Sequence, residues 1–477
     1  MRGLRALVGT RNRPPREAPP ESVDVAIVGG GLAGGIVADR LTAAGQSCLM
    51  IEAGRHWHSD AFPLPELTQG QLFWNQGMEF TTDGRMMVLR GKGVGGSSVV
   101  NQALLDHAPE AATARWGAKT GMSWLEDGTL RCRSEALLKS GRFQHRVIPE
   151  EANNRNAKHF LAGMAATGHR ARQLRRAQAE CGWDEGQNCM DCLGGCPRRS
   201  KQSALVTTIP RAEARGLRIL AETEVDALSE RRDGVTLMLR RAGRRHHLRA
   251  AHVVLTAGAI GTTAILLRSG LGGRAVGDGF FVHPQFNTFA RFADPVDGHL
   301  GAFQSVASDE PAFAEQGFKL ECIALPRAVM ALTLPWSGTQ SAQLDDYRHW
   351  AGAEASIRDT DPGRIRAGKH RVTLVKHLSD GDKAKRAAAR HALIEVFRAA
   401  GAERIVHGWA SLSVHPMGGA SLGGVVDPEF RPHGTRRIRV ADVSLFPDAL
   451  GANPSLTVMA LADLAADAVL ADRSVHV

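Results

Sequence analysis

The 477-residue sequence has no long uninterrupted run of apolar residues, although 43% of its residues are hydrophobic. A membrane-spanning helix needs about 18 or more such residues in succession, so we expect no transmembrane segment. Within the first 22 residues the only apolar patch, 4–8, is too short for the core of a secretory signal peptide. We expect residues 1–22, with five arginines and four prolines, to form a disordered basic leader. We also expect a cytoplasmic protein.

Aromatic residues are scarce, since they make up 5% of the chain and include a single tyrosine. The formal net charge is +10, but the basic residues are not interleaved with aromatic side chains on which nucleic-acid bases could stack. We therefore expect no nucleic-acid partner. Attraction of anionic substrates or of an acidic partner protein is a simpler use of the charge. A partner subunit and the oligomeric state stay open.

Cysteine is also too rare and too unevenly placed for a disulfide scaffold, because the chain has seven cysteines, an odd number. Four of them form a cluster, namely Cys181, Cys189, Cys192 and Cys196. Thiolates at this spacing could ligate an iron–sulfur cluster or zinc. They suit a metal-free packed loop or a disulfide equally well. We favour the metal-free interpretation, with an iron–sulfur cluster as the first alternative and zinc as the second.

The amino-terminal part of the chain begins with a βαβ pattern. A short apolar segment at 23–28 predicts a buried strand, which runs into a glycine-rich turn and a helix through Leu41. A second apolar strand at 47–52 follows. The pattern predicts a Rossmann-like, dinucleotide-binding α/β domain.

The turn in this unit has the form Gly29-x-Gly31-x-x-Gly34. Its first glycine permits a tight turn, its second lets backbone N–H groups approach a pyrophosphate, and its third allows close helix packing. Glu52 ends the second strand, where an acid can bind a ribose hydroxyl. We therefore predict that these four residues hold a dinucleotide.

Further strands and helices follow along the chain. The expected strands of a β-meander and its surroundings are 218–221, 225–231, 235–240, 245–249 and 253–257. Short alternating strands near 319–325 and 371–375, then an amphipathic helix at 383–400, predict an α+β unit built on an antiparallel sheet. The tail has a strand at 438–441 and a helix at 455–470, and we expect it to return to the first domain.

Several longer motifs identify a family. They are RGKGVGGSSVVN at 90–101, GAIGTTAILLRSGLG at 258–272, VGDGFFVHP at 276–284, and the tail segments HPMGG, VADVSLFP and ANPSLTVMALA between 415 and 462. Together they resemble the glucose–methanol–choline (GMC) family of FAD-dependent oxidoreductases. The tail is most similar to the branch that contains bacterial cholesterol oxidase, long-chain alcohol oxidases and sugar dehydrogenases. The resemblance covers nearly the whole chain.

This resemblance implies an enzyme that binds FAD and passes a hydride from a CH–OH group to flavin N5. Its catalytic pair maps to His415, which would act as the base, and Asn453, which would donate a hydrogen bond to the same substrate oxygen. The remaining cofactor contacts that it implies are Gly95, Gly96, Ser97, Asn101, Val225, Asp442 and Pro454. We expect His283 to be structural.

The implied organisation is an FAD-binding domain at 23–283 with a cysteine-rich insertion at 181–203, a substrate domain at 284–410, and a return segment at 411–477 that carries the catalytic residues. The substrate would be an alcohol or a sugar, and the electrons would pass to O2 or to another acceptor. The identity of the alcohol stays open, and so does the question whether the enzyme is an oxidase or a dehydrogenase. Two alternatives also stay open: an FAD-containing lyase or decarboxylase, and an electron-transferring dehydrogenase subunit with an iron–sulfur cluster.

Overall fold

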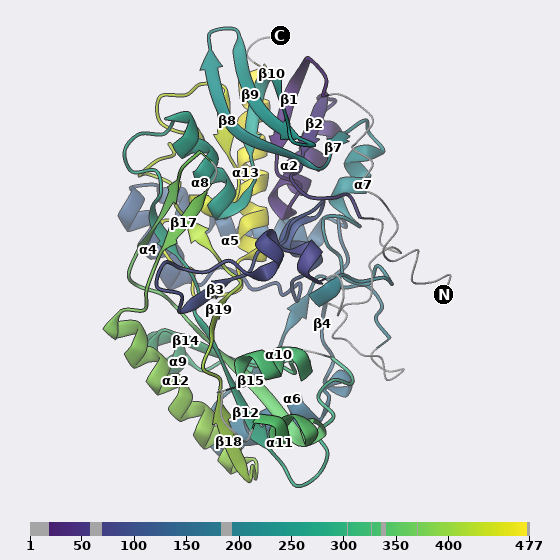
Figure 1. Cartoon of the computed structure of the whole chain (residues 1–477), viewed down its shortest axis with the longest axis vertical. Coiled ribbons are helices and arrows are strands. Elements are labelled where there is room, and N and C mark those ends of the chain that lie inside the picture. The colour runs from purple at the N-terminus through teal and green to yellow at the C-terminus, as the bar shows by residue number, and fades with distance from the viewer. Residues whose placement is uncertain are drawn as a thin grey trace.

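The computed structural model describes residues 19–57, 69–182, 193–302, 304–325, 327–334, 340–369 and 371–474. Its ribbon has two lobes, with the amino-terminal strands and the last helix in one and the central part of the chain in the other (Figure 1). None of the helices in the described ranges is long and apolar enough to cross a membrane. Residues 1–18 of the expected leader, 1–22, lie outside these ranges. Its last residue, Ser22, begins the first strand.

The first lobe is built on a seven-stranded sheet. Its order is β7 (Arg218–Leu220), β2 (Cys48–Ile51), β1 (Ser22–Val28), β10 (Arg244–Leu255), β9 (Gly234–Arg241) and β8 (Thr223–Arg231), with β21 (Ile438–Val440) paired to β10. The expected strands at 245–249 and 253–257 are one continuous strand. The first half of β10 pairs antiparallel with β9, and its second half pairs parallel with β1. This strand therefore joins the meander to the Rossmann-like half.

Two long helices, α2 (Leu32–Ala43) and α13 (Ser455–Ser474), pack together in this lobe (Figure 1). Arg40 of α2 forms ion pairs with Asp463 and Asp467 of α13. Further helices complete the lobe: α4 (Glu110–Thr120), α5 (Thr129–Lys139), α7 (Thr208–Glu213) and α8 (Gly258–Ser269). The tail thus returns to the first lobe as both a strand and a helix.

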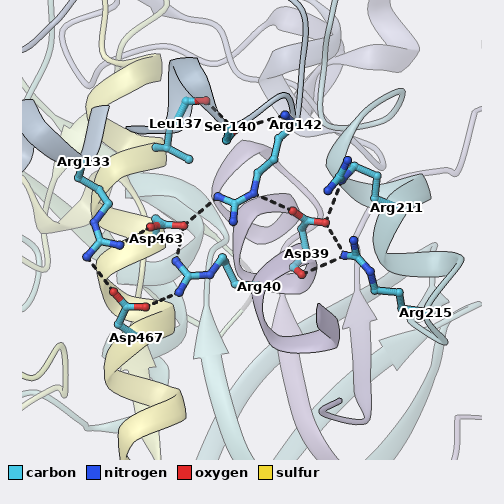
Figure 2. Close-up of polar contacts among 10 residues, drawn as sticks. All are labelled: Asp39, Arg40, Arg133, Leu137, Ser140, Arg142, Arg211, Arg215, Asp463 and Asp467. Carbon is cyan, nitrogen blue, oxygen red and sulfur yellow. Dashed lines mark hydrogen bonds and ion pairs between the residues drawn. The ribbon is translucent and has the colours of Figure 1, made fainter. Parts of the chain in front are cut away.

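Buried aspartates and arginines join α2, α5, α7 and α13 (Figure 2). Asp39 of α2 contacts Arg142, Arg211 and Arg215, at 2.7–3.2 Å. Asp463 of α13 contacts Arg40, Arg133 and Arg142, at 2.6–3.2 Å. The two aspartate side chains are 3% and 4% exposed, so each is desolvated and depends on its guanidinium partners. The network fixes α13 against α2 and the helices that flank them.

The second lobe is built on an eight-stranded, mainly antiparallel sheet. Its order is β3 (Met86–Val88), β19 (Ser411–Ser413), β12 (Gln285–Arg291), β15 (Trp350–Ile357), β14 (Phe318–Cys322), β13 (Val306–Ser308) and β5 (Ala171–Gln173), with β18 (Arg404–His407) beside β12. Helices α6 (Arg155–Ala166) and α12 (Asp380–Ala399) pack on it, and α9 (Pro311–Gln316), α10 (Arg327–Thr333) and α11 (Gln340–Asp345) are shorter. Its strands and helices come partly from outside 284–410, and the domain boundaries we expect stay a prediction.

The helix expected at 383–400 begins earlier, at Asp380, because Ser379 caps it. The Ser379 hydroxyl accepts a hydrogen bond from the Asp382 amide at 3.1 Å, which satisfies one of the unpaired N–H groups of the first turn. A third sheet has four strands, in the order β17 (Val372–Val375), β16 (Gly363–Ala367), β11 (Asp278–Phe281) and β20 (Met417–Gly418). In the sequence, β11 and β20 each lie between a strand of the first lobe and a strand of the second. The fold class expected from the sequence is confirmed.

Candidate active site

Two glycine-rich loops meet back to back at the amino end of α2. Gly34 lies against Gly29, because a Cβ at Gly34 would fall 2.1 Å from the Gly29 carbonyl oxygen. Gly96, with φ +53°, approaches Gly31 so closely that a Cβ there would lie 2.8 Å from the Gly31 Cα. A Cβ at Gly31 itself would meet no heavy atom closer than 4.0 Å. Gly31 thus keeps the open side that backbone contact with a pyrophosphate requires.

Glu52 links these two loops. Its carboxylate accepts hydrogen bonds from the backbone N–H groups of Gly30 and Gly54, both at 2.8 Å, and of Gly93 at 3.2 Å. Burial raises the pKa of Glu52, and the three N–H groups oppose that rise. A carboxylate has about four acceptor positions, so one remains for a ribose hydroxyl. Glu52 therefore holds the two glycine loops together.

A small cavity of about 20 Å³ lies between the amino ends of α2 and α13. Its lining brings together Leu32 of α2, Ser98 and Asn101 of the second glycine loop, and Ser455 and Met459 of α13. Three of the motifs found in the sequence thus border one space. The open side of Gly31 and the remaining acceptor position of Glu52 suit the pyrophosphate and a ribose of FAD, because backbone N–H groups at a helix amino end bind phosphate.

The other expected contacts lie in the same lobe. Ser97 accepts a hydrogen bond from the Gly91 amide at 2.9 Å, and Val225 is buried on β8. Asp442 is also buried, and its carboxylate accepts from the Gly258 amide at 2.8 Å and from the Thr262 hydroxyl at 2.6 Å. It thereby fixes the tail to the start of α8.

His415 lies opposite His283 because of a strand register. β11 and β20 pair antiparallel with Phe281 beside Met417, so the residues two positions beyond, His283 and His415, face each other. Their Nδ1 atoms are 3.1 Å apart, and their rings are nearly perpendicular, at 87°. His283 is 1% exposed, and His415 is partly exposed. Burial lowers the pKa of both imidazoles, that of His415 to about 4.

Asn453 is held by two carboxylates that were not predicted from the sequence. Its amide nitrogen Nδ2 donates to Asp106 at 2.9 Å and to Glu321 at 3.2 Å. Because carboxylates only accept hydrogen bonds when ionised, this assigns the NH2 group of Asn453 to them. Its Oδ1 atom has no hydrogen-bond partner in the described part of the chain and is not a buried unsatisfied atom. Asn453 thus presents an acceptor, whereas the sequence-based hypothesis made it a donor.

Lys319 lies between these carboxylates. Its ammonium contacts Asp106 at 2.7 Å and Glu321 at 2.6 Å, and Arg172 contacts Asp106 at 2.6 Å. Burial opposes ionisation of Asp106, but the charges of Lys319 and Arg172 outweigh it and hold the pKa of Asp106 well below its usual range. Glu354 pairs with Glu321 across β14 and β15. Burial and the neighbouring carboxylate raise the pKa of Glu354 to about 8, so it keeps its proton at neutral pH.

The cluster around Asn453 is therefore close to neutral, with two carboxylates, two cations and one carboxyl that holds its proton. The sequence alone indicates two members of this cluster, Lys319 and Glu321. Lys319 and Glu321 alternate on a predicted strand, so they share one face, and an ionisable pair on the buried face of a strand needs partners. Asp106 and Glu354 lack any comparable local signal.

The predicted cysteine cluster falls largely outside the described residues, since Cys189 and Cys192 belong to 183–192. Cys181 and Cys196 are both partly buried. Within the described ranges no group of three or more histidine, cysteine, aspartate or glutamate side chains could hold a metal ion.

Comparisons with known proteins agree with this geometry. Models of the GMC oxidoreductase family match residues 27–285 and 359–462. A GMC-type oxidoreductase from Mycobacterium tuberculosis is 28% identical over 94% of this chain and 76% of its own length. A long-chain-alcohol oxidase from Arabidopsis thaliana is 24% identical over 92% of this chain and 67% of its own length.

Among solved structures, Aspergillus oryzae formate oxidase, studied for modification of its FAD, superimposes with a TM-score of 0.71 at 17% identity. The match covers 96% of this chain and all of that one, and it confirms the fold. The family models cover the glycine loops, His415 and Asn453 together. The chain accordingly belongs to the GMC oxidoreductases, a family of flavoprotein enzymes.

Proposed function

We propose that this protein binds FAD and oxidises a CH–OH group of a small-molecule alcohol. The observation that carries the proposal is a chain of contacts: His283 joins His415 to Gly451, two residues before Asn453. Two residues after Asn453, Ser455 lines a cavity together with Ser98 and Asn101 of the second glycine loop. Bound FAD would supply a two-electron acceptor for a hydride. The chain's own residues would hold the cofactor and orient the alcohol oxygen beside it.

The residues that would hold FAD fall into two groups. Gly29, Gly31, Gly34 and Glu52 form the cradle for the adenine nucleotide end, with Val225 nearby on β8. Gly95, Gly96, Ser97, Asn101, Asp442 and Pro454 would border the pyrophosphate, ribityl and flavin parts. The amino end of α13 directly follows Pro454, and its positive dipole end would favour the negative charge of a reduced flavin.

The alcohol oxygen would lie between His415 and Asn453. Both side chains keep one polar atom without a hydrogen-bond partner in the described ranges, namely Nε2 of His415 and Oδ1 of Asn453. One hydroxyl can both accept and donate, so two such atoms suffice to orient it. The charged and amide side chains behind Asn453 favour a polar alcohol or a sugar over an aliphatic chain.

An absorbance spectrum of the purified protein tests the proposal. We expect a flavin spectrum, and we expect it to bleach when an alcohol is added without oxygen. The panel contains a sugar, small polar alcohols and a long-chain alcohol. The long-chain alcohol is included because one relative is a long-chain-alcohol oxidase. Protein that takes up no flavin, or a bound flavin that no alcohol bleaches, would contradict the proposal. Return of the colour in air would then identify an oxidase.

A further inference from the structure

We infer that His283 fixes the tautomer of His415, so that neutral His415 presents an Nε2–H donor to the substrate oxygen. The tautomer follows from contacts within the chain. Its meaning for an alcohol substrate rests on the proposed function. His283 is thereby a positioning residue, and it departs from the purely structural role expected from the sequence.

The first step concerns Nε2 of His283. This atom lies 2.9 Å from the backbone nitrogen of Gly451, and a backbone N–H can only donate. Nε2 of His283 must therefore be the acceptor and carry no proton. A neutral imidazole has its single proton on the other nitrogen, so His283 is protonated at Nδ1.

The second step passes this assignment to His415. The Nδ1–H of His283 points at Nδ1 of His415, 3.1 Å away, so the latter atom must be the acceptor. Neutral His415 then carries its proton on Nε2. Nε2 makes no hydrogen bond within the described ranges and is not buried without a partner, so this N–H is available to a ligand.

The opposite tautomer would place two donors against each other. If His415 carried its proton on Nδ1, then His283 would have to accept there and carry its own proton on Nε2, facing the N–H of Gly451. A protonated His415 meets the same conflict, because an imidazolium has a proton on both nitrogens. The low pKa of His415 agrees with this exclusion. The ionisable groups around the pair are Lys319, Arg358, Glu321 and Asp106.

His283 also joins the two segments that carry the expected catalytic residues. Through Nδ1 it contacts His415, and through Nε2 it holds Gly451, two residues before Asn453. Gly451 has φ +82°, a left-handed conformation that suits glycine. One buried ring thus sets the spacing between His415 and Asn453 as well as the tautomer.

The tautomer changes the role of His415 from base to hydrogen-bond donor. The substrate oxygen would accept from Nε2–H of His415 and donate its own proton toward Oδ1 of Asn453. The carbinol carbon would lose a hydride, with two electrons, to the flavin, and the hydroxyl would lose its proton to solvent water. The alcohol then becomes a carbonyl compound, and the N–H of His415 stabilises the negative charge that develops on its oxygen.

Nitrogen NMR of histidine-labelled protein reads the tautomer without turnover. We expect the wild-type spectrum to show His415, assigned by its loss in His415→Gln, as the Nε2–H form. In His283→Leu the constraint is gone, and we expect a mixture of tautomers. His283→Asn keeps a donor near the Nδ1 position and should keep the Nε2–H form. A wild-type Nδ1–H tautomer, or no change in His283→Leu, would overturn the inference.

Kinetics separate a donor from a base. His415→Gln keeps an N–H donor, whereas His415→Leu removes it, and loss of one such donor costs about 10²–10³-fold in rate. We expect the glutamine variant to recover most of that loss. Equal loss in both variants would show a base and overturn the donor role. Failure of the proposed function would differ, since wild-type flavin would then stay oxidised with every alcohol while the NMR result stood.

Discussion

Lys319→Met should destabilise the protein strongly, because it removes the cation between two buried carboxylates. The side chains of Lys319, Asp106 and Glu321 are 12%, 5% and 2% exposed, and both ion-pair distances are below 3 Å. After the change Asp106 keeps Arg172, while Glu321 keeps only neutral hydrogen-bond partners in the described ranges: Asn453, Gln304 and the protonated Glu354. Leaving a buried charge unpaired costs about 3–5 kcal/mol in the free energy of unfolding.

Urea denaturation followed by circular dichroism measures this loss. Lys383→Met is the matched control, because Lys383 pairs with an exposed aspartate, Asp380, on the surface of α12. We expect the control to unfold close to wild type, since exposed ion pairs contribute little. Adding Glu321→Gln to Lys319→Met removes the uncompensated charge and should restore part of the stability. A loss below about 1 kcal/mol in Lys319→Met would refute the reasoning, because it would mean that water or relaxation already compensates the carboxylates.

Three further changes probe other parts of the molecule. Asp463→Asn should lower the thermal midpoint, by about 1.5–3 kcal/mol in stability, because a buried carboxylate loses its charge-assisted bonds to three arginines, although each arginine keeps Asp467 or Asp39. Asp467→Asn, at a side chain 41% exposed, should do much less. Gly96→Ala should weaken FAD binding in a flavin titration, since its Cβ would collide with the facing loop, whereas Gly84→Ala, also at positive φ but in open space, should leave the affinity unchanged. Burial and a like charge raise the pKa of Glu354 to about 8, so the folded protein holds this proton while the unfolded chain releases it near pH 4.5. Wild-type stability should therefore fall relative to Glu354→Gln as pH rises from about 4.5 to 8, and parallel urea midpoints at pH 5, 6.5 and 8 would expose an error in this sign.

The sequence predicted best those features that short stretches of chain encode. The first strand, the glycine turn and Glu52 form one local unit, and the structure places them as the βαβ pattern required. His415 and Asn453 came from motifs with the same local character. The fold class and the family followed from these motifs together.

The charge cluster behind Asn453 could not be predicted, because long-range strand pairing creates it. Glu354 reaches Glu321 only through the register of β14 against β15, and Asp106 arrives from a segment more than 200 residues earlier in the chain. That Asp106 and Glu321 accept hydrogen bonds from Asn453 could likewise not be foreseen, and the expected role of Asn453 toward the substrate stays a prediction. The position of His283 depends on the pairing of β11 with β20, which no local pattern specifies.

The tail's return to the first lobe has a consequence for biosynthesis. On the ribosome, the strands around β1 emerge some 400 residues before β21 and α13. The early segment can form its local βαβ unit, yet Ser455 and Met459 of the cavity wall and both proposed substrate-binding side chains belong to residues translated last. Under the proposed function, FAD would therefore be captured late in maturation, because a nascent chain stalled before residue 415 lacks both of these side chains and α13.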